Sequence, residues 1–384
     1  MGTGSNPCAN ASSDNRSLLE PAAWRRVMQR AEQLCAHGDF PALALEVHRG
    51  GRRTGVRTFG RVQPESGAAL PEDAIFLVAS LTKPIVAMAA LLLVERGQLS
   101  LMDRVVDYVP EFSGADRKSI TVRNLLTHTS GLPDMLPNNR ALRERQSPLS
   151  GFVTGTCGVT LDFPVGRGVQ YQSMGFALLG QIISQLSGMT YGEFLQREFF
   201  EPLGMQDTAL SPTVEWLRAP VRASRLTTNR LPPDQVGQES WNWNSDYWRT
   251  LGAPWGGMLT TVHDLGRYCR MMLGEGTLSG VRVLSPATVR AATTNQLDCL
   301  HDVPEADRRT RPWGFGWRLN WPAHSTVFCD LLPPDAFGHW GATGTLFWMD
   351  RRSDTAAILL STQPLDMGSS GELTRLSNMI AAGL

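Results

Sequence analysis

The 384-residue sequence lacks a long apolar segment, and it has no excess of either charge. Its longest apolar run, residues 84–94, is far shorter than the roughly 20 residues that a membrane-spanning helix needs. Thirty-six basic residues balance thirty-six acidic ones, whereas proteins that bind nucleic acids carry basic patches. We therefore expect no nucleic-acid partner and no membrane partner, and a small neutral molecule is the expected ligand.

The first residues, 1–17, contain no apolar stretch that could form the core of a signal peptide. We expect this segment to be a polar N-terminal leader. The absence of both a signal peptide and a membrane-length run predicts a cytoplasmic protein. The sequence does not indicate an oligomeric state.

Cysteine pairs and several common catalytic motifs are also missing. The six cysteines are scattered, without a Cys-x-x-Cys pair or a nearby histidine at metal-ligand spacing, so we expect free thiols and no metal site. The sequence has no Walker loop, no His-Glu-x-x-His and no Gly-x-Ser-x-Gly. We therefore expect no cofactor and no nucleophile elbow of the α/β-hydrolase type.

Lysine is rare, since only Lys83 and Lys118 accompany 34 arginines. Lys83 follows Ser80 by three residues, a spacing that places both side chains on one face of a helix. Apolar residues flank Lys83, and burial lowers the pKa of an amine, whereas a guanidinium cannot lose its proton. Lys83 could therefore act as a base toward Ser80. The alternative is an ordinary helix lysine with an exposed amine beside an N-cap serine.

Hydrophobic periodicity predicts a helix and strands at each end of the chain, around a mainly helical middle. The expected helices span residues 18–37, 81–96, 176–186, 191–200 and 370–382, and the expected strands span residues 42–48, 55–60, 336–340, 343–350 and 355–361. We expect residues 18–75 and 300–384 to form one α/β domain, and residues 76–299 to form a mainly helical domain.

Three short motifs occur in an informative order: Ser80-x-x-Lys83, Tyr171-Gln172-Ser173 and His339-Trp340-Gly341. Their order and approximate spacing resemble those of the class C β-lactamase-like, or penicillin-recognising, serine hydrolases. Further stretches that are similar to this family are residues 125–133, 201–205, 256–261 and 314–317. The resemblance extends from about residue 38 to the end of the chain.

The resemblance implies a mixed α/β fold of the α+β type, with an antiparallel sheet flanked by helices and a second, mostly helical domain. The active site would lie in the cleft between the two domains. Ser80 would be the nucleophile, and Lys83 and Tyr171 would form the base system, with their individual roles left open. The backbone N–H groups of Ser80 and Ala342 would form the oxyanion hole.

Two departures from the lactamase motifs bear on the substrate. Ser173 replaces an asparagine, and His339 replaces the lysine that holds the carboxylate of a β-lactam. A histidine with a pKa of about 6.5 is mostly neutral at pH 7. Both changes resemble the family VIII carboxylesterases, so we expect a serine carboxylesterase that hydrolyses small uncharged esters. The alternatives are a β-lactamase, a D-amino-acid peptidase, an acyltransferase of the same fold, and a non-catalytic scaffold.

The residues expected to contact substrate have structural alternatives. Tyr171 could cap a helix, and His339 could be an ordinary strand histidine. Substrate-binding roles are expected for Ser173, His339, Trp340, Gly341, Trp241 and Trp243. The wider cluster of Trp241, Trp243, Tyr247, Trp248 and Trp255 could line the pocket or seal the core between the domains. We assign structural roles to His128 and Cys157.

Overall fold

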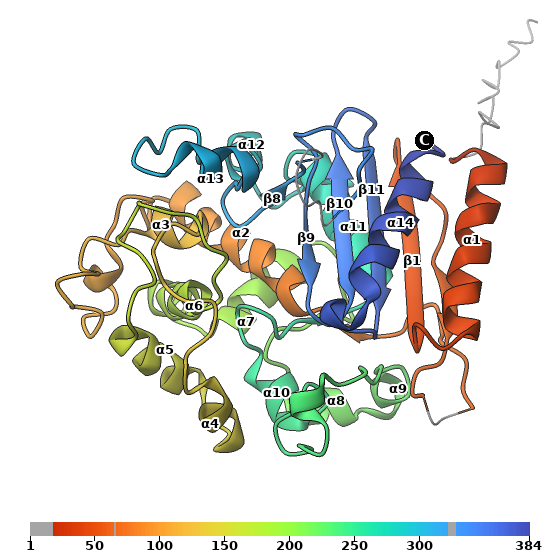
Figure 1. The fold of residues 1–384 in the computed structure, drawn as a ribbon, viewed down its shortest axis with the longest axis horizontal. Coiled ribbons are helices and arrows are strands. Elements are labelled where there is room, and N and C mark those ends of the chain that lie inside the picture. The colour runs from red at the N-terminus through yellow and green to blue at the C-terminus, as the bar shows by residue number, and fades with distance from the viewer. Residues whose placement is uncertain (1–17, 65–66, 322–327) are drawn as a thin grey trace, which may run out of the picture.

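The computed structural model describes residues 18–64, 67–321 and 328–384, in which an antiparallel sheet stands beside a mainly helical part (Figure 1). The leader predicted for residues 1–17 lies outside the described residues. The strand order is β2-β1-β11-β10-β9-β8, and β3 also pairs with β1. The strands of this sheet are β1 (Ala42–Arg49), β2 (Arg52–Arg53), β3 (Arg57–Gly60), β8 (Arg318–Leu319), β9 (Phe337–Gly341), β10 (Thr345–Asp350) and β11 (Thr355–Ser361).

Opposite ends of the chain share this sheet. Strand β1 pairs with β11 in an antiparallel register that places Leu43 opposite Ser361. Helices α1 (Pro21–Ala36) and α14 (Ser369–Ala381) contact each other on one face of the sheet. The mixed α/β fold with an antiparallel sheet, predicted from the sequence, is confirmed.

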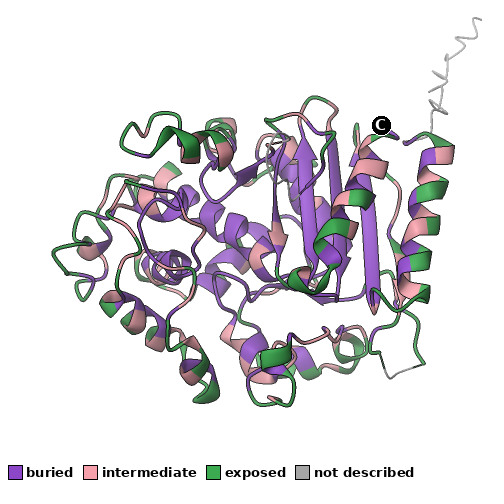
Figure 2. Cartoon of the chain, in the orientation of Figure 1, coloured by how far each residue is buried: buried purple, intermediate pink, exposed green. Residues whose placement is uncertain are grey.

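Both faces of the central strands are covered. Successive side chains of a strand point to opposite faces, and in β1 Leu43 and Leu45 pack in the core beneath α1 and α14, whereas Ala42 and Ala44 pack in the core on the other face. Figure 2 shows the central strands as buried and the outer sides of α1 and α14 as exposed. Two covered faces explain why these strands are almost continuously apolar.

Helix α11 (Val262–Leu273) packs on the sheet, although its residues fall within the segment 76–299 that we expected to form the helical domain. It contacts β1 and β11 on the face opposite α1. Gly266 permits the close approach, because a Cβ there would lie 2.4 Å from Nε2 of His48. Proximity in sequence to the other middle helices therefore did not determine where this helix packs.

The helical part is built around α2, which is buried from Thr82 to Leu93 and packs against α6 and α12. Its helices are α2 (Thr82–Glu95), α3 (Val122–Leu126), α4 (Asn139–Glu144), α5 (Leu149–Gly158), α6 (Met174–Ser187), α7 (Tyr191–Leu195), α8 (Val214–Arg218), α9 (Pro220–Ala223), α10 (Asp246–Leu251), α12 (Pro286–Ala292) and α13 (Glu305–Thr310). Two small antiparallel pairs complete it: β4 (Phe76–Leu77) with β5 (Leu259–Thr260), and β6 (Thr277–Leu278) with β7 (Val281–Arg282). In the described residues, no helix is long and apolar enough to span a membrane.

The sheet meets the helical part at a short 3₁₀ turn, η1 (Ala79–Leu81), which contacts β9 and β10. The hydroxyl of Thr345 donates a hydrogen bond of 2.8 Å to the carbonyl of Val78. Gly341 lies so close to this turn that a Cβ there would be 2.2 Å from the Val78 oxygen. The glycine therefore allows the end of β9 to contact the turn that carries Ser80.

Candidate active site

The backbone immediately before Ser80 is strained. Ala79 has a φ of +46°, a left-handed conformation that non-glycine residues rarely adopt. Two hydrogen bonds hold the turn, because the Thr82 hydroxyl donates to the Ala79 carbonyl at 2.7 Å and accepts from the Met258 N–H at 3.1 Å. Strain of this kind needs support from its surroundings and is concentrated at functional sites.

Lys83 is fully buried, and its ammonium nitrogen has three hydrogen-bond acceptors. Its Nζ donates to Ser80 Oγ at 2.9 Å, to Tyr171 Oη at 2.6 Å and to the Trp255 carbonyl at 2.9 Å. All three acceptors are uncharged, and burial lowers the pKa of Lys83 to about 7, against an opposing effect from Asp134. A substantial share of neutral amine is therefore present near pH 7.

Tyr171 differs from Lys83 in the direction of its pKa shift. Burial raises the pKa of the Tyr171 phenol above its ordinary value, and the nearby Asp134 carboxylate adds to the shift. The phenol therefore stays protonated near neutral pH, and its proton is available for donation to a leaving group. The sequence left open which of the two groups is the base, and these opposite shifts favour the amine.

His128 holds the backbone on both sides of Tyr171. Its carbonyl accepts the Gln170 N–H at 3.0 Å, and its Nδ1 accepts the Gln172 N–H at 3.2 Å. The imidazole is fully buried, and burial keeps its pKa well below the ordinary value, so it is neutral. His128 also has a left-handed backbone, with a φ of +60°. These contacts fix the position of Tyr171 from a segment about forty residues away.

Aromatic side chains surround the Tyr171 ring. The ring centroid of His128 lies 5.2 Å away, that of Trp340 5.6 Å, that of His339 5.9 Å and that of Trp313 6.0 Å. The Lys83 nitrogen lies 4.5 Å from the centre of the same ring. The phenol therefore has little freedom to change its direction relative to the amine.

Ala342, the expected second oxyanion donor, directly follows strand β9 and lines the same cavity as Ser80. Its carbonyl accepts the N–H of Leu365 at 3.1 Å, while its own N–H donates to no other residue among those described. The Thr343 hydroxyl donates to the Leu77 carbonyl at 2.7 Å, which fixes this loop beside the turn before Ser80. The Ala342 amide is therefore available to a ligand in the cavity.

Ser173 is held by the loop that contains Asp134. Its hydroxyl donates to Asp134 Oδ1 at 2.6 Å, and its N–H donates to the Asp134 carbonyl at 3.1 Å. Both residues line the cavity. The position where lactamase motifs carry an amide therefore presents a hydroxyl that is already bonded to a carboxylate.

His339 lies within β9 and is fully buried, outside the residues that line the cavity. Its Nδ1 contacts the backbone of the neighbouring Trp340. Burial, together with the charge of Lys83, lowers the pKa of His339 to about 3, so the ring is neutral at pH 7. The structure therefore places no histidine cation beside the cavity at this position, and Gly341 also lies outside the lining.

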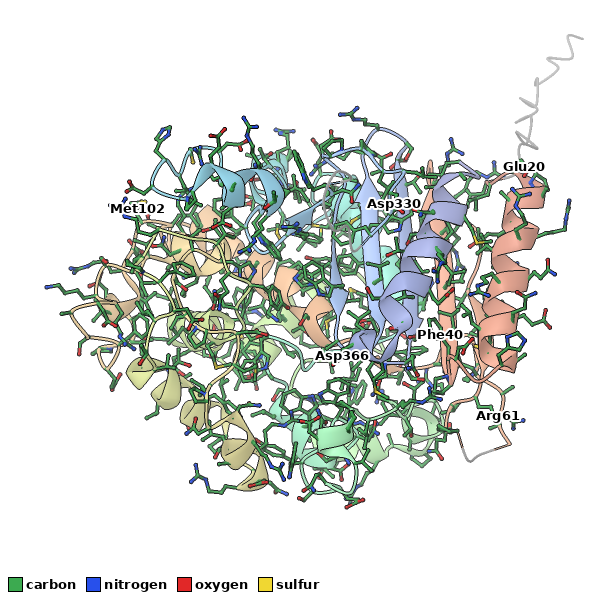
Figure 3. All side chains as sticks on the ribbon, viewed as in Figure 1. Glu20, Phe40, Arg61, Met102, Asp330 and Asp366 are labelled. Carbon is green, nitrogen blue, oxygen red and sulfur yellow. The ribbon has the colours of Figure 1, made fainter. Side chains whose placement is uncertain are left out.

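The cavity has a volume of about 410 Å³, and its lining includes the aromatic rings of Tyr171, Trp243, Trp248, Trp255 and Trp340. Trp243 and Trp340 line it as expected substrate contacts, whereas Trp241 is buried behind Arg143, 4.8 Å from its guanidinium carbon. Figure 3 labels one of the lining residues, Asp366, at the lower end of the sheet. The principal lining residues are Leu77, Ser80, Asp134, Met135, Arg143, Tyr171, Ser173, Asp234, Gln235, Trp243, Trp248, Trp255, Trp340, Ala342, Leu365 and Asp366.

Four residues near the reacting groups carried no functional assignment from the sequence: Asp134, Arg143, Trp313 and His128. Asp134 and Arg143 line the cavity, and Trp313 and His128 pack around Tyr171. His128 stands in the stretch 125–133 that resembles the family, and this was the available signal for it. The other three have no comparable signal in the motifs.

Metal ligands and cysteines add no further chemistry to this site. The described ranges contain no group of three or more His, Cys, Asp or Glu side chains that could hold a metal ion. The described cysteines are free thiols: Cys35, Cys157, Cys269, Cys299 and Cys329. Cys8 lies outside the described residues.

Comparison with known proteins identifies the family. A family model described as Beta-lactamase matches residues 27–378. The chain is 30% identical to penicillin-binding protein 4 of Amycolatopsis lactamdurans, over 86% of this chain and 81% of the relative. Among solved structures, a penicillin-binding protein homologue from Caulobacter crescentus superposes with a TM-score of 0.77 at 21% identity, over 96% of this chain and 99% of the other.

A second solved structure is described as EstCE1, a hydrolase with promiscuous acyltransferase activity. It superposes with a TM-score of 0.72 at 17% identity, covering 94% of this chain and 98% of the other. At these identities the solved structures show a shared fold. The family match covers most of the chain, so this protein belongs to the Beta-lactamase family, within the superfamily of β-lactamase-like and penicillin-binding serine hydrolases.

Proposed function

We propose that the protein is a serine carboxylesterase that hydrolyses small uncharged carboxylic esters through an acyl-enzyme on Ser80. The main support is the position of Lys83, a buried amine with a pKa of about 7 that contacts both Ser80 Oγ and Tyr171 Oη. An amine of this kind can remove the serine proton near neutral pH. The proposed reaction would need neither a metal nor an organic cofactor.

In the first half-reaction the neutral amine of Lys83 accepts the Ser80 proton while Ser80 Oγ bonds to the ester carbonyl carbon. The carbonyl oxygen becomes an oxyanion, which accepts hydrogen bonds from the backbone N–H groups of Ser80 and Ala342. When the intermediate collapses, the bond from carbon to the alcohol oxygen breaks. Tyr171 gives its proton to that oxygen and regains one from the Lys83 ammonium, 2.6 Å away.

In the second half-reaction a water molecule attacks the acyl carbon and loses a proton to the neutral Lys83 amine. The bond between the acyl carbon and Ser80 Oγ then breaks, Ser80 regains a proton, and the carboxylic acid leaves. The same amine thus serves both halves of the cycle, first as base and then as the source of the returning proton.

Charge in the cavity favours esters over anionic β-lactams. His339 is neutral and does not line the cavity, so it offers no cation to a β-lactam carboxylate. Carboxylates of Asp134, Asp234 and Asp366 line the cavity, and they disfavour the binding of an anionic substrate. Arg143 is the one cationic side chain in the described lining, and it lies beyond Trp248.

The experiment compares p-nitrophenyl esters of increasing chain length with a chromogenic cephalosporin and a dipeptide that ends in D-alanine. We expect kcat/KM for the esters to exceed that for both other substrates, and Ser80→Ala to abolish turnover. Faster turnover of the cephalosporin would make the protein a β-lactamase, and faster release of D-alanine would make it a peptidase. Brief exposure to an activated ester should add one acyl mass to Ser80.

Transfer to an alcohol is a second candidate, and the shared fold with EstCE1, titled a hydrolase with promiscuous acyltransferase activity, favours testing it. Product analysis with added methanol measures the ratio of methyl ester to free acid. A fluorophosphonate probe that failed to label Ser80 in the folded protein would support a non-catalytic scaffold instead.

A further inference from the structure

One wall of the cavity leads from the reacting groups to a buried arginine. The Trp255 carbonyl accepts a hydrogen bond from Lys83, and the Trp255 ring lies 6.4 Å from the ring of Trp248. The Arg143 guanidinium carbon lies 4.2 Å from the centre of the Trp248 ring. Trp255, Trp248 and Arg143 all line the cavity. The wall is therefore apolar next to Ser80 and polar at its far end.

Arg143 is buried at this far end and is only 6% exposed. Its guanidinium lies over the rings of both Trp248 and Trp241. Its Nη2 donates to Gln235 Oε1 at 3.2 Å and to the Trp241 carbonyl at 3.0 Å. Burial lowers the pKa of Arg143 to about 10, so the group keeps its charge at pH 7.

Most of the donors of Arg143 are unused. A guanidinium has five N–H groups, yet in the part of the chain that the structure describes, only Nη2 of Arg143 donates hydrogen bonds. Nε is buried without a partner. A buried cation with unfilled donors is costly, and an added acceptor oxygen offsets that cost.

We propose that this end of the cavity binds a carbonyl oxygen on the acyl chain of the substrate, separated from the ester by an apolar section that lies along Trp255 and Trp248. Arg143 donates the hydrogen bond to that oxygen through Nη1. The inference rests on the proposed esterase function and narrows its substrate class to esters of oxygenated acyl chains.

The positions of the reacting groups assign this wall to the acyl chain. Tyr171 protonates the departing alcohol, so the alcohol leaves beside the Tyr171 ring and Trp340, which stacks on it at 5.6 Å. Trp255 contacts Lys83 through a different hydrogen bond and packs against Phe152 rather than against Tyr171. The two parts of an ester can therefore occupy different walls.

The test uses p-nitrophenyl octanoate, p-nitrophenyl esters of the same chain length that carry a ketone at successive positions, and the p-nitrophenyl half-ester of octanedioic acid. We expect one ketone position to raise kcat/KM about tenfold or more over the octanoate ester, the effect of one hydrogen bond from a charged donor. The half-ester should be a poorer substrate than that ketone, because Asp234 lines the cavity close enough to affect the pKa of Arg143.

Variants test whether Arg143 is the donor. Arg143→Lys and Arg143→Gln should each reduce the ketone-to-octanoate ratio toward one, and this ratio is independent of how much of a preparation is active. Arg145→Gln changes an exposed arginine two residues away and should keep the ratio. If the Arg143 variants do not fold, the ketone-to-octanoate ratios of the wild-type protein decide whether the cavity binds a carbonyl oxygen on the acyl chain.

The outcomes separate the two proposals. No turnover of any ester would contradict the esterase function itself. Turnover of all esters at similar rates, or a ratio that Arg143→Lys and Arg143→Gln leave unchanged, would overturn the acyl-chain site alone. A half-ester preferred over every ketone would overturn the assignment of a neutral carbonyl oxygen to this site.

Discussion

Two buried cations beside one cavity behave differently. Lys83 lies at the nucleophile, and burial lowers its pKa to about 7, whereas Arg143 lies beyond Trp248, and burial lowers its pKa only to about 10. At neutral pH the amine can lose its proton and the guanidinium cannot. The same kind of environment thus produces a base at one end of the cavity and a fixed positive charge at the other.

The partners of the two groups agree with this difference. Lys83 uses its three donors on Ser80, Tyr171 and Trp255, so its hydrogen bonds hold the reacting groups together. Arg143 leaves donors unused and faces a cavity large enough for a substrate chain. Proton transfer therefore belongs to the first end, and substrate recognition to the second.

The largest expected effect on activity comes from replacing Lys83 with arginine, the residue type at the other end of the cavity. Lys83→Arg keeps the charge but removes the group that can lose a proton, so kcat/KM for p-nitrophenyl butyrate should fall by about a thousandfold. Lys118→Arg changes the other lysine, which is exposed, and serves as the matched control with activity near wild type. Activity of Lys83→Arg within tenfold of wild type would contradict the role of the amine.

A smaller loss of kcat/KM is expected when Lys83 is unchanged and the position of Tyr171 is less well fixed. His128→Ala removes the Nδ1 acceptor for the Gln172 N–H and should lower kcat/KM about tenfold to a hundredfold, because Tyr171 is no longer held in direction. His37→Ala, an exposed histidine, is the control. In a Tyr171→Phe background the His128 change should cost little more. Additive losses in the double variant would assign His128 to general stability.

The pH dependence of acylation should follow the amine. Since the neutral form of Lys83 is the base, kcat/KM should rise about tenfold per pH unit below about pH 7 and then level off. The measurement is a pH–rate profile with an uncharged ester from about pH 5 to about pH 9. A profile that is flat across this range would show that Lys83 is not the titrating base.

The smallest expected effect is on stability. The pKa of Lys83 is lower in the folded state, about 7, than in the unfolded chain, about 10.4, so between these values the unfolded chain binds more protons. The unfolding free energy of wild type should therefore rise with pH relative to Lys83→Met, by at most about 1.4 kcal/mol per pH unit. Urea unfolding of both proteins measures this difference. A difference that falls with pH would contradict the direction of the shift.

Much of the fold was predictable because its core helices and strands follow simple residue patterns. Helix α2 was expected over residues 81–96 and spans Thr82–Glu95, because every face of it is apolar. Strand β10 was expected to begin at residue 343 and begins at Thr345, because Gly344 has a φ of +90° and belongs to the turn. Packing partners were harder to predict, since nothing in the sequence of α11 indicates whether this helix packs on the sheet or against the other helices.

The candidate site was predictable where motifs carry it and unpredictable where contacts between distant segments create it. Trp241 and Trp243 lie two residues apart in an irregular segment, where no periodicity indicates which side chain faces the cavity. Arg143 and Asp134 are polar residues without a motif, and they reach the cavity because α4 and the loop before α4 pack beside Trp248 and Ser173. Such contacts depend on tertiary packing.

Lys83 should be a neutral amine at the pH at which the enzyme works, and the scarcity of lysine makes its protonation state directly measurable. Lysine labelled with carbon-13 at the ε position should give two NMR signals in the folded protein, from Lys83 and Lys118. Lys118→Arg leaves the Lys83 signal alone. We predict that this signal titrates near pH 7. A Lys83 signal that titrates near the ordinary lysine value of about 10.4 would contradict it.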